Sequence, residues 1–284
     1  MDSLMDVGSL KQRLDADRRT VLLDVRWVLG DPDGQAHYLA GHLPGAVYVD
    51  LHHELADPGI AGEGRHPLPP AEALQRSARA WGISDGDTVV AYDDTGNMAA
   101  ARAWWLLRDA GLTSVFLLDG GLAAWRAAGH PLEQGVVRPA PGTVTLRPGQ
   151  LPRTNMEGAC DWHEHGVLLD ARAGERFRGE VEPIDPRAGH IPGALSAPTG
   201  ENLDADGRFL PAAELRARFE ALGIDDATDL AVYCGSGVTA AHQLAALEIA
   251  GFRASLYPGS FSQWSSNAAN AVATGPEPGG SVGA

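Results

Sequence analysis

The sequence predicts an α/β protein made of two tandem copies of one domain, each a central parallel sheet flanked by helices. Two observations predict this class. The order of the motifs repeats once along the chain, and within each copy short apolar runs alternate with segments whose apolar residues recur at helical spacing. Such alternation is typical of parallel sheets that helices cover on both faces. A chain of 284 residues is long enough for two domains with separate cores.

Four blocks recur in the same order and carry the repeat. They are VLLDVR (21–26) with VLLDAR (167–172), AGHLPG (40–45) with AGHIPG (188–193), TVVAYD (88–93) with DLAVYC (229–234), and GGLAAW (120–125) with GSFSQW (259–264). The proline-rich stretch 133–154 lies between the copies and has no helical period, so we expect an extended linker there. We therefore place the first domain at 1–132 and the second at 155–284.

The elements of each copy follow from the same patterns. Buried strands are expected at 21–26, 46–50, 88–93 and 114–120 in the first copy, and at 167–172, 229–234 and 254–260 in the second. Amphipathic helices are expected at 70–82 and 98–111, and at 211–223 and 238–251. In parallel sheets ligands bind at the carboxyl ends of strands, which directs attention to the residues after 88–93 and 229–234.

Composition excludes several classes of function. Lys and Arg number 22 and Asp and Glu 37, which gives a net charge of −15 that disfavours broad binding to nucleic acid or to anionic membranes. No apolar stretch is long enough to span a bilayer, and the N-terminus has no secretory pattern. With two cysteines and no export signal, a disulfide framework is not expected. We expect a cytoplasmic protein.

Cys234 is the candidate nucleophile. It ends a predicted strand, Gly235, Ser236 and Gly237 follow, and a helix is expected to start near Val238 or Thr239. Two glycines let successive backbone N–H groups turn inward, and with the helix N-terminus they make an anion-binding nest that favours the thiolate. A cysteine at a strand end is more commonly a small buried side chain, but this turn and helix favour a reactive one.

The first copy serves as an internal comparison. Asp93 stands where the second copy has Cys234, and Gly96 matches Gly237. A carboxylate cannot act as a thiolate nucleophile, and we expect it to fit poorly in a nest meant for a transferred anion. The sequence therefore predicts one active site, in the second copy.

These features together resemble the rhodanese superfamily, in particular its two-domain sulfurtransferases. They are the tandem modules, DVRW (24–27), the AGHLPGA and AGHIPGA pair, and the loop from Cys234 to Thr239. The resemblance implies that Cys234 takes a sulfane sulfur from a small donor as a persulfide and passes it to a thiophilic acceptor, such as cyanide, a thiol or thioredoxin. It implies no metal or organic cofactor and a catalytically inactive first domain.

The loop also bears on the donor. Its backbone and side chains, Gly235, Ser236, Gly237, Val238 and Thr239, would bind the transferred sulfur. Thiosulfate-using relatives carry basic residues where this loop has Gly235 and Ser236, so the resemblance favours 3-mercaptopyruvate, with thiosulfate as the alternative. Relatives of this kind bind the donor carboxylate through two arginines. Arg176 matches the first position, whereas Ile184 replaces the second and Arg187 is the candidate substitute.

Other polar residues have weaker interpretations. His42 and His190 recur in both copies, which favours a structural role, although His42 with Asp31 or Asp33 could supply the Ser/His/Asp relay that the resemblance implies. Cys160 lies near His163 and His165, but their spacing does not place all three on one helix face, so we expect a partly buried structural cysteine and no metal. Arg65 could line a cleft between the copies.

Two competing functions remain. Phosphatases related to rhodaneses need an arginine six residues after the cysteine, and Ala240 stands there, which disfavours phosphoester hydrolysis. A non-catalytic binding scaffold is the other alternative, and the intact loop after Cys234 disfavours it. The chain gives no direct indication of its oligomeric state; two copies packed on each other would make a monomer sufficient.

Overall fold

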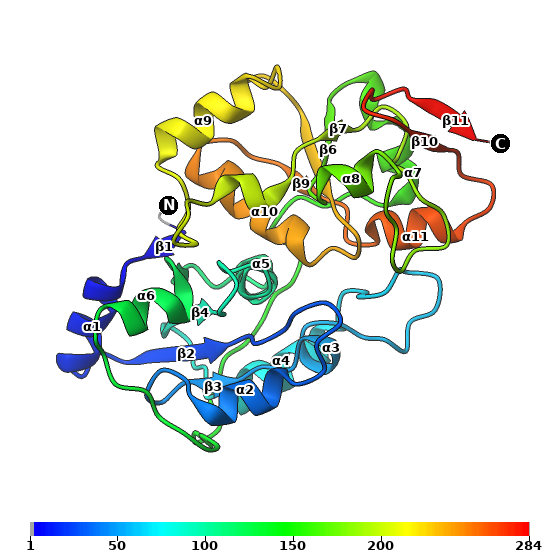
Figure 1. Ribbon diagram of the computed structural model, residues 1–284. Helices are drawn as coiled ribbons and strands as arrows, with labels where there is room; N and C mark the ends of the chain where they lie inside the picture. The colour runs from blue at the N-terminus through cyan, green and yellow to red at the C-terminus, as the bar shows by residue number, and fades with distance from the viewer. Residues whose placement is uncertain (1–2, 284) are drawn as a thin grey trace. The chain divides into compact units, whose positions relative to one another are not determined.

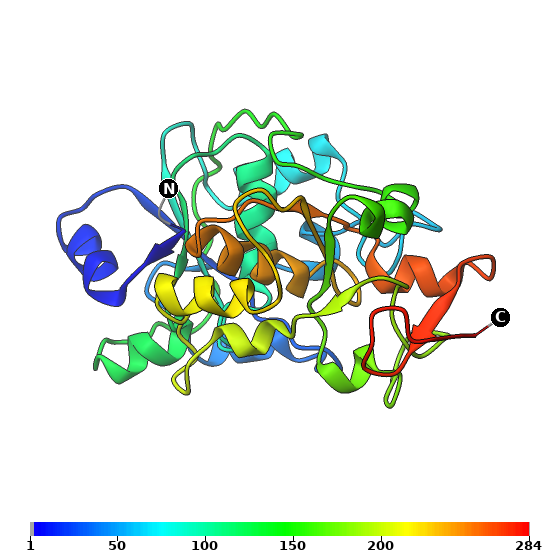
Figure 2. The same ribbon diagram turned by 90° about the horizontal axis from the view of Figure 1, so that it is seen from above.

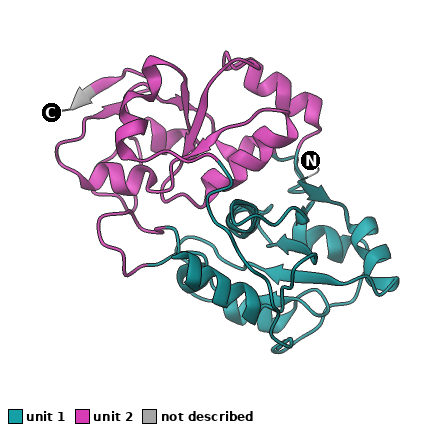
Figure 3. Cartoon of the chain, turned by 180° about the vertical axis from the view of Figure 1, so that it is seen from behind, with its two compact units in different colours: residues 1–57, 68–151, 203–209 teal, residues 58–67, 152–202, 210–284 magenta. Residues whose placement is uncertain are grey.

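The computed structural model describes residues 3–283 as two compact units, coloured separately in Figure 3. The first unit holds the chain up to residue 57, residues 68–151 and residues 203–209. The second holds residues 58–67, residues 152–202 and the chain from residue 210 onward. Two short segments are thus exchanged: 58–67 lies within the first repeat in sequence but belongs to the second unit, and 203–209 lies within the second repeat but belongs to the first unit.

A parallel five-stranded sheet forms the centre of the first unit. Its strands are β1 (Leu4–Met5), β2 (Thr20–Asp24), β3 (Val47–Tyr48), β4 (Thr88–Tyr92) and β5 (Val115–Leu118), in the order β1-β5-β4-β2-β3. The register of the two central strands places Leu22 beside Val90. Every residue of β2 and β4 after the first is buried, as expected of strands covered on both faces. The predicted α/β class is confirmed for this unit.

Helices cover both faces of this sheet (Figures 1 and 2). They are α1 (Val7–Asp15), α2 (Gly34–Ala40), α3 (Leu51–Glu54), α4 (Ala71–Ala80), α5 (Ala100–Asp109) and α6 (Gly121–Ala127). One core cluster joins Leu10 of α1 and Trp125 of α6 to Leu22 and Val90 of the sheet. On the opposite face α5 is buried over nearly its whole length, which agrees with its continuous apolar sequence.

The second unit repeats this architecture with a parallel four-stranded sheet. Its strands are β6 (Val167–Asp170), β7 (Leu195–Ser196), β8 (Leu230–Tyr233) and β9 (Ser255–Leu256), in the order β7-β6-β8-β9. A separate antiparallel pair joins β10 (Val272–Thr274) to β11 (Ser281–Gly283). The register aligns Leu168 with Ala231 and Asp170 with Tyr233, so the polar ends of β6 and β8 meet at one edge of the sheet.

Helices again cover both faces. They are α7 (Met156–Asp161), α8 (Gly174–Phe177), α9 (Ala212–Glu220), α10 (Thr239–Ile249) and α11 (Ser260–Ser266), with short 3₁₀ turns η1 (Trp162–Glu164) and η2 (Thr199–Asn202). A core cluster joins Ala159 of α7, Phe177 of α8 and Trp264 of α11 to Tyr233 of β8. Figure 2 shows α9 beside α10, away from these three helices. The predicted class is confirmed for this unit too.

The stretch predicted as a linker has no helix or strand between residues 136 and 151. It runs along the first unit, where Val144 N–H donates to Ile83 O at 3.1 Å and Arg147 N–H to Ala110 O at 2.8 Å. Val144 is buried, so this chain is anchored to the unit it follows. In residues 3–283, none of the helices combines the length and apolar character that a membrane span requires.

Candidate active site

Cys234 follows β8 directly, at the carboxyl end of a central strand. Its side chain is 1 % exposed, and Sγ accepts a hydrogen bond from the N–H of Gly237 at 3.1 Å. Gly237 has φ +76°, and a Cβ there would lie 2.4 Å from Pro258 O, so only glycine fits this turn. Helix α10 starts two residues later at Thr239. The loop therefore gives the sulfur a backbone donor, and the N-terminus of α10 follows within two residues of it.

The first turn of α11 holds this loop in place. Phe261 N–H donates to Cys234 O at 2.9 Å, and Ser262 N–H donates to Gly235 O at 2.8 Å. Ser260 Oγ accepts the Cys234 N–H at 3.2 Å and donates to Tyr257 O at 2.9 Å. The backbone around Cys234 is thus bonded on both its N–H and its C=O groups, which fixes the direction of the side chain.

Ser260 adopts a conformation that is unusual for a residue with a Cβ. Its φ is +53° and it is completely buried. In the first unit Gly121 occupies the matching position with the same φ of +53°. Serine costs backbone energy here that glycine does not, so its hydroxyl bond to the Cys234 N–H offers a reason for its presence in the copy that carries the cysteine.

Ser236 meets a histidine that the sequence analysis did not connect to it. His66 Nδ1 lies 2.7 Å from Ser236 Oγ, and both side chains are buried. His42 makes the contacts of the favoured structural role: its Nδ1 bonds Tyr38 O at 2.9 Å and its ring stacks on Tyr38, so the alternative of His42 as the relay partner is corrected. His66 stands 170 positions from Ser236 in the sequence, so no local pattern could have paired them.

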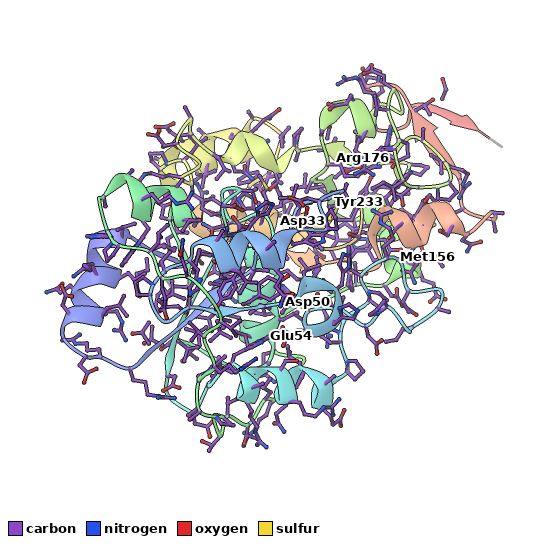
Figure 4. The ribbon with its side chains drawn as sticks, turned by 60° about the horizontal axis from the view of Figure 1, so that its bottom comes forward. Asp33, Asp50, Glu54, Met156, Arg176 and Tyr233 are labelled. Atoms are coloured by element: carbon purple, nitrogen blue, oxygen red, sulfur yellow. The ribbon has the colours of Figure 1, made fainter. Side chains whose placement is uncertain are left out.

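Two guanidinium groups converge above Gly235. A Cβ at this glycine would lie 3.0 Å from Arg65 Nη2 and 3.4 Å from Arg176 Nη1. Arg176 extends from α8 and donates to Glu182 Oε1 at 2.7 Å and to Asp185 Oδ2 at 3.2 Å. Figure 4 labels Arg176 together with Tyr233, the residue before Cys234. Arg176 therefore lies next to the loop.

Arg176 belongs to a chain of alternating charges that leads from the core to the loop. Its members are Asp170, Arg172, Glu182, Arg176, Asp185 and Arg65, and each forms an ion pair with the next. Burial raises the pKa of Asp185 despite Arg65 and Arg176 beside it. Burial also acts to raise the pKa of Glu182, but the Asp185 N–H and Arg176 outweigh it, so this pKa lies below its ordinary value. These contacts fix the position of Arg176.

Arg187 is not brought to this loop by any contact that the structure records for it. Its guanidinium donates to the carbonyls of Ser265 at 2.9 Å, Asn267 at 2.7 Å and Asn270 at 2.6 Å. These oxygens lie at and beyond the C-terminus of α11, where unpaired carbonyls attract a cation. Spacing from Ile184 had suggested this residue, but spacing does not fix the direction of a side chain.

The matching loop of the first unit is filled by its own side chain. Asp93 Oδ1 accepts the N–H groups of Thr95 and Asn97 at 2.8 and 2.7 Å. Asp93 Oδ2 accepts those of Ala99 and Ala100 at 2.8 and 3.0 Å. The expectation that a carboxylate fits this nest poorly is wrong, because four backbone donors surround it. These four donors are therefore already bonded to the protein's own carboxylate.

The remaining candidates lie apart from this constellation. His190 Nδ1 bonds Phe177 O at 2.8 Å and its ring stacks on Phe177, the counterpart of His42 on Tyr38. Cys160 is exposed, so the expectation of a partly buried thiol is wrong. It lies at the surface end of α7, where the helix gives way to η1. Among residues 3–283 no group of three or more His, Cys, Asp or Glu side chains is arranged to hold a metal ion.

Comparison with known proteins places these features in a family. The rhodanese-like domain matches twice, over residues 6–128 and 155–267. A putative thiosulfate sulfurtransferase, SseB, from Mycobacterium tuberculosis is 48% identical over 275 residues, covering 96% of this chain and 97% of that protein. A probable 3-mercaptopyruvate sulfurtransferase from Pseudomonas aeruginosa is also 48% identical, over 281 residues, covering 96% and 98%.

Solved structures agree with the sequence matches. The crystal structure of SseA from Escherichia coli, described as a 3-mercaptopyruvate sulfotransferase, superposes with a TM-score of 0.82 at 32% identity. It covers 92% of this chain and 100% of its own. The resemblance inferred from the motifs is confirmed: the chain belongs to the rhodanese family, with both of its repeats matching the domain that defines it.

Proposed function

We propose that the protein is a sulfurtransferase that accepts a sulfane sulfur on Cys234 from 3-mercaptopyruvate and passes it to a thiophilic acceptor, cyanide or a thiol. One observation carries the proposal: Sγ of Cys234 accepts the Gly237 N–H at 3.1 Å at the end of β8, with α10 starting just beyond. A backbone donor and a helix N-terminus stabilise negative charge on sulfur, both as the initial thiolate and as the persulfide.

The first step transfers sulfur to the enzyme. The Cys234 thiolate attacks the donor sulfur; an S–S bond forms, the C–S bond breaks, and its electron pair stays on carbon as the enolate of pyruvate. The proton of the donor thiol reaches that carbon by way of the Ser236 hydroxyl and the imidazole of His66, which are hydrogen-bonded at 2.7 Å. The products are the Cys234 persulfide and pyruvate.

The second step returns the enzyme to its initial state. Cyanide or a thiolate attacks the outer sulfur of the persulfide, and the S–S bond breaks with its electron pair left on Cys234. With cyanide the product is thiocyanate. The step needs no external oxidant or reductant, and the loop donors that held the persulfide again face the thiolate.

The choice of 3-mercaptopyruvate over thiosulfate as the donor rests on the charge of the site. Relatives of equal identity are named for thiosulfate and for 3-mercaptopyruvate, so their names do not choose between them. The loop itself carries no cation between Gly235 and Thr239, and the nearby arginines are largely balanced by Glu182 and Asp185. Such a site suits a monoanionic keto acid, whose carboxylate Arg176 can bind, better than a dianion. Thiosulfate is the alternative donor.

We also propose the division of labour between the repeats. Residues 155–284 form the catalytic domain, with 58–67 contributing His66, and residues 1–132 otherwise form an inactive domain. Occupation of the first unit's nest by Asp93 supports this division. A phosphatase is disfavoured because Ala240, six residues after Cys234, is a buried residue of α10 with no cation to offer.

The proposal also covers the sulfur acceptor, the oligomeric state and the cellular location. A small thiol or thioredoxin would accept the sulfur, the protein would act as a monomer, and it would reside in the cytoplasm. The net charge of −15 supports small solutes as substrates rather than nucleic acid or an anionic membrane.

Thiocyanate formation tests the proposal. The wild-type protein should form thiocyanate from cyanide and 3-mercaptopyruvate, and Cys234→Ser should form none. Cys160→Ser is the matched control, because Cys160 is exposed and lies on α7, and it should retain full activity. Activity retained in Cys234→Ser would refute the mechanism, and a wild-type protein inactive with every sulfur donor would favour the binding scaffold.

A further inference from the structure

We propose that the first unit has a binding site of its own, for a small zwitterion of the α-amino acid class. The site is a pocket of about 310 Å³, a volume that suits a small molecule. Its walls come from the segments after β2 and β4, from α2 and from the last turn of α6, all within the first unit. Its charged residues are Arg26, Asp31, Asp94 and Arg126. This site does not depend on the sulfurtransferase function.

The pocket lies where parallel sheets commonly bind ligands. Arg26 follows β2 and Asp94 follows β4, so both stand at the carboxyl edge of the two central strands, as Cys234 does in the second unit. Gly34 begins α2 directly against this edge. A Cβ there would lie 1.9 Å from Arg26 O, so only glycine allows the approach. The adjoining nest is filled by Asp93, and a ligand in the pocket would therefore meet side chains.

The first repeat places two charges at this edge that the second repeat lacks. The blocks that match β4 with β8 align Asp94 with Gly235, and those that match α6 with α11 align Arg126 with Ser265. A carboxylate and a guanidinium thus stand where the catalytic repeat has two small uncharged residues. The pocket is therefore not a faded copy of the donor site, and its chemistry calls for a different ligand.

The positive groups of the pocket are two guanidiniums beside Gly41. Arg26 Nη2 donates to Gly41 O at 3.2 Å, and Arg126 Nη2 lies 3.8 Å from the point where a Cβ of Gly41 would stand. Arg26 is buried and bonded to Asp24 through Nε and Nη2. Arg126 is exposed, and no described residue is a hydrogen-bond or ion-pair partner of its guanidinium. Arg126 is therefore free to bind a carboxylate through two parallel N–H groups.

The negative groups are two carboxylates. Asp94 Oδ2 lies 3.5 Å from Arg26 Nη1, and the Asp94 side chain is 35% exposed. Asp31 Oδ2 lies 3.1 Å from His37 Nε2, and Oδ1 accepts at 2.8 Å the N–H of Asp33, which Figure 4 labels. The Asp33 N–H, and after it His37, holds the pKa of Asp31 below its ordinary value. Each carboxylate retains acceptor capacity for an ammonium group.

This set of groups fits a zwitterion better than an ion of either sign. With Asp24 included, and the imidazole of His37 left aside, two guanidiniums face three carboxylates. A simple anion would meet a net negative charge, and a simple cation would meet the unpaired guanidinium of Arg126. An α-amino acid offers a carboxylate to Arg126 and an ammonium to the two exposed aspartates. Val28 and Ala40 give the wall an apolar part that suits a short side chain.

Titration with L-alanine, followed through the chemical shifts of backbone amides, tests the site. The wild-type protein should bind L-alanine about tenfold more tightly than propionate, which lacks the ammonium, or ethylamine, which lacks the carboxylate. Tenfold is the lower end of what a hydrogen bond to a charged group contributes, as expected at an exposed site. The amides that shift should be those around Arg26, Asp94 and α2.

Variants assign the two ends of the ligand. Arg126→Gln should raise the dissociation constant of L-alanine about tenfold, and Arg126→Lys should recover part of the loss, since it keeps the charge without the fork. Asp94→Asn should weaken L-alanine by a similar factor without weakening propionate. The matched control is Arg138→Gln, because Arg138 is exposed and lies outside the pocket, and it should leave the constant unchanged. Urea unfolding checks that each variant folds.

The outcomes that contradict the proposal are distinct. Binding of L-alanine that is lost in Arg176→Gln and kept in Arg126→Gln would place the ligand beside the Cys234 loop. Propionate or inorganic phosphate that binds as tightly as L-alanine would make the pocket a simple anion site. Absence of any L-alanine shift in the wild type would exclude the site. A sulfurtransferase proposal that failed would instead show absent thiocyanate, with the L-alanine titration unaffected.

Discussion

Replacing Ser260 tests how the second unit fixes its cysteine. Its hydroxyl accepts the Cys234 N–H at 3.2 Å and donates to Tyr257 O at 2.9 Å, and the residue is completely buried. Ser260→Ala leaves both backbone groups without this partner at a cost of about 1–3 kcal/mol for each group left unsatisfied. It also keeps the Cβ at φ +53°, so nothing offsets the loss.

Ser260→Gly removes the same hydroxyl but also removes the backbone strain. A left-handed residue with a Cβ costs about 1–2 kcal/mol relative to glycine, so the glycine variant should be more stable than the alanine variant by about that amount. Gly121 is the matched position in the first unit, with φ +53°, where a Cβ would lie 2.4 Å from Asp93 O. Gly121→Ala should therefore destabilise the protein while leaving the Cys234 loop intact.

The assay combines urea unfolding with the rate at which 3-mercaptopyruvate loads the persulfide. Both Ser260 variants should load more slowly than wild type, since the Cys234 N–H is no longer held, and Gly121→Ala should load at the wild-type rate once folded. Equal stability of Ser260→Ala and wild type, or an alanine variant more stable than the glycine variant, would refute the reasoning.

Three further predictions follow from the ionic and hydrogen-bonded groups. Asp93→Ala should lower the free energy of unfolding by at least about 3 kcal/mol, because four backbone N–H groups lose their acceptor. Thiocyanate formation at low denaturant should not change, and a small loss of stability in urea unfolding would argue that Asp93 does not fill the nest. Glu182 has a pKa below its ordinary value of 4.5, so the stability it contributes is present above pH 4.5 and is lost as the pH falls through the lower pKa of the folded state. Glu182→Gln should reduce this fall in the free energy of unfolding at acid pH. An unchanged pH dependence in the variant would contradict the role given to Glu182. Ser236→Ala should slow persulfide loading by about 100-fold or more, because the proton path to His66 is lost. Ser266→Ala is the control, since its hydroxyl donates to Ser262 O at 2.7 Å within α11, and it should load at the wild-type rate; equal rates for both variants would exclude the relay.

Much of the fold follows from local patterns in the sequence. The central strands β2, β4, β6 and β8 were predictable because each is a run of apolar residues buried on both faces. Two-residue β1 is different: Leu4–Met5 is a strand only because it pairs with Leu117 and Leu118 of β5. Elements this short are defined by their partners, and a single-sequence pattern does not contain those partners.

The residues of the active site also fall into those that the local sequence predicts and those that it does not. Cys234 and Gly237 were predictable because a turn and the helix after it are encoded in consecutive residues. His66 and Arg65 were not connected to the loop, because a segment that precedes the second repeat packs into the second unit. The sequence did contain a signal, a turn-rich stretch with a cation and a histidine side by side at 65–66, but nothing local showed which loop it would meet.

The mass of the intact protein after exposure to 3-mercaptopyruvate and removal of the small molecules tests the central claim most directly. A persulfide on Cys234 predicts a gain of one sulfur atom in the wild type and in Cys160→Ser, no gain in Cys234→Ser, and loss of the added sulfur when cyanide is supplied. Sulfur added to the Cys234→Ser protein, or a wild-type protein that never gains it from any sulfane donor, would contradict the account.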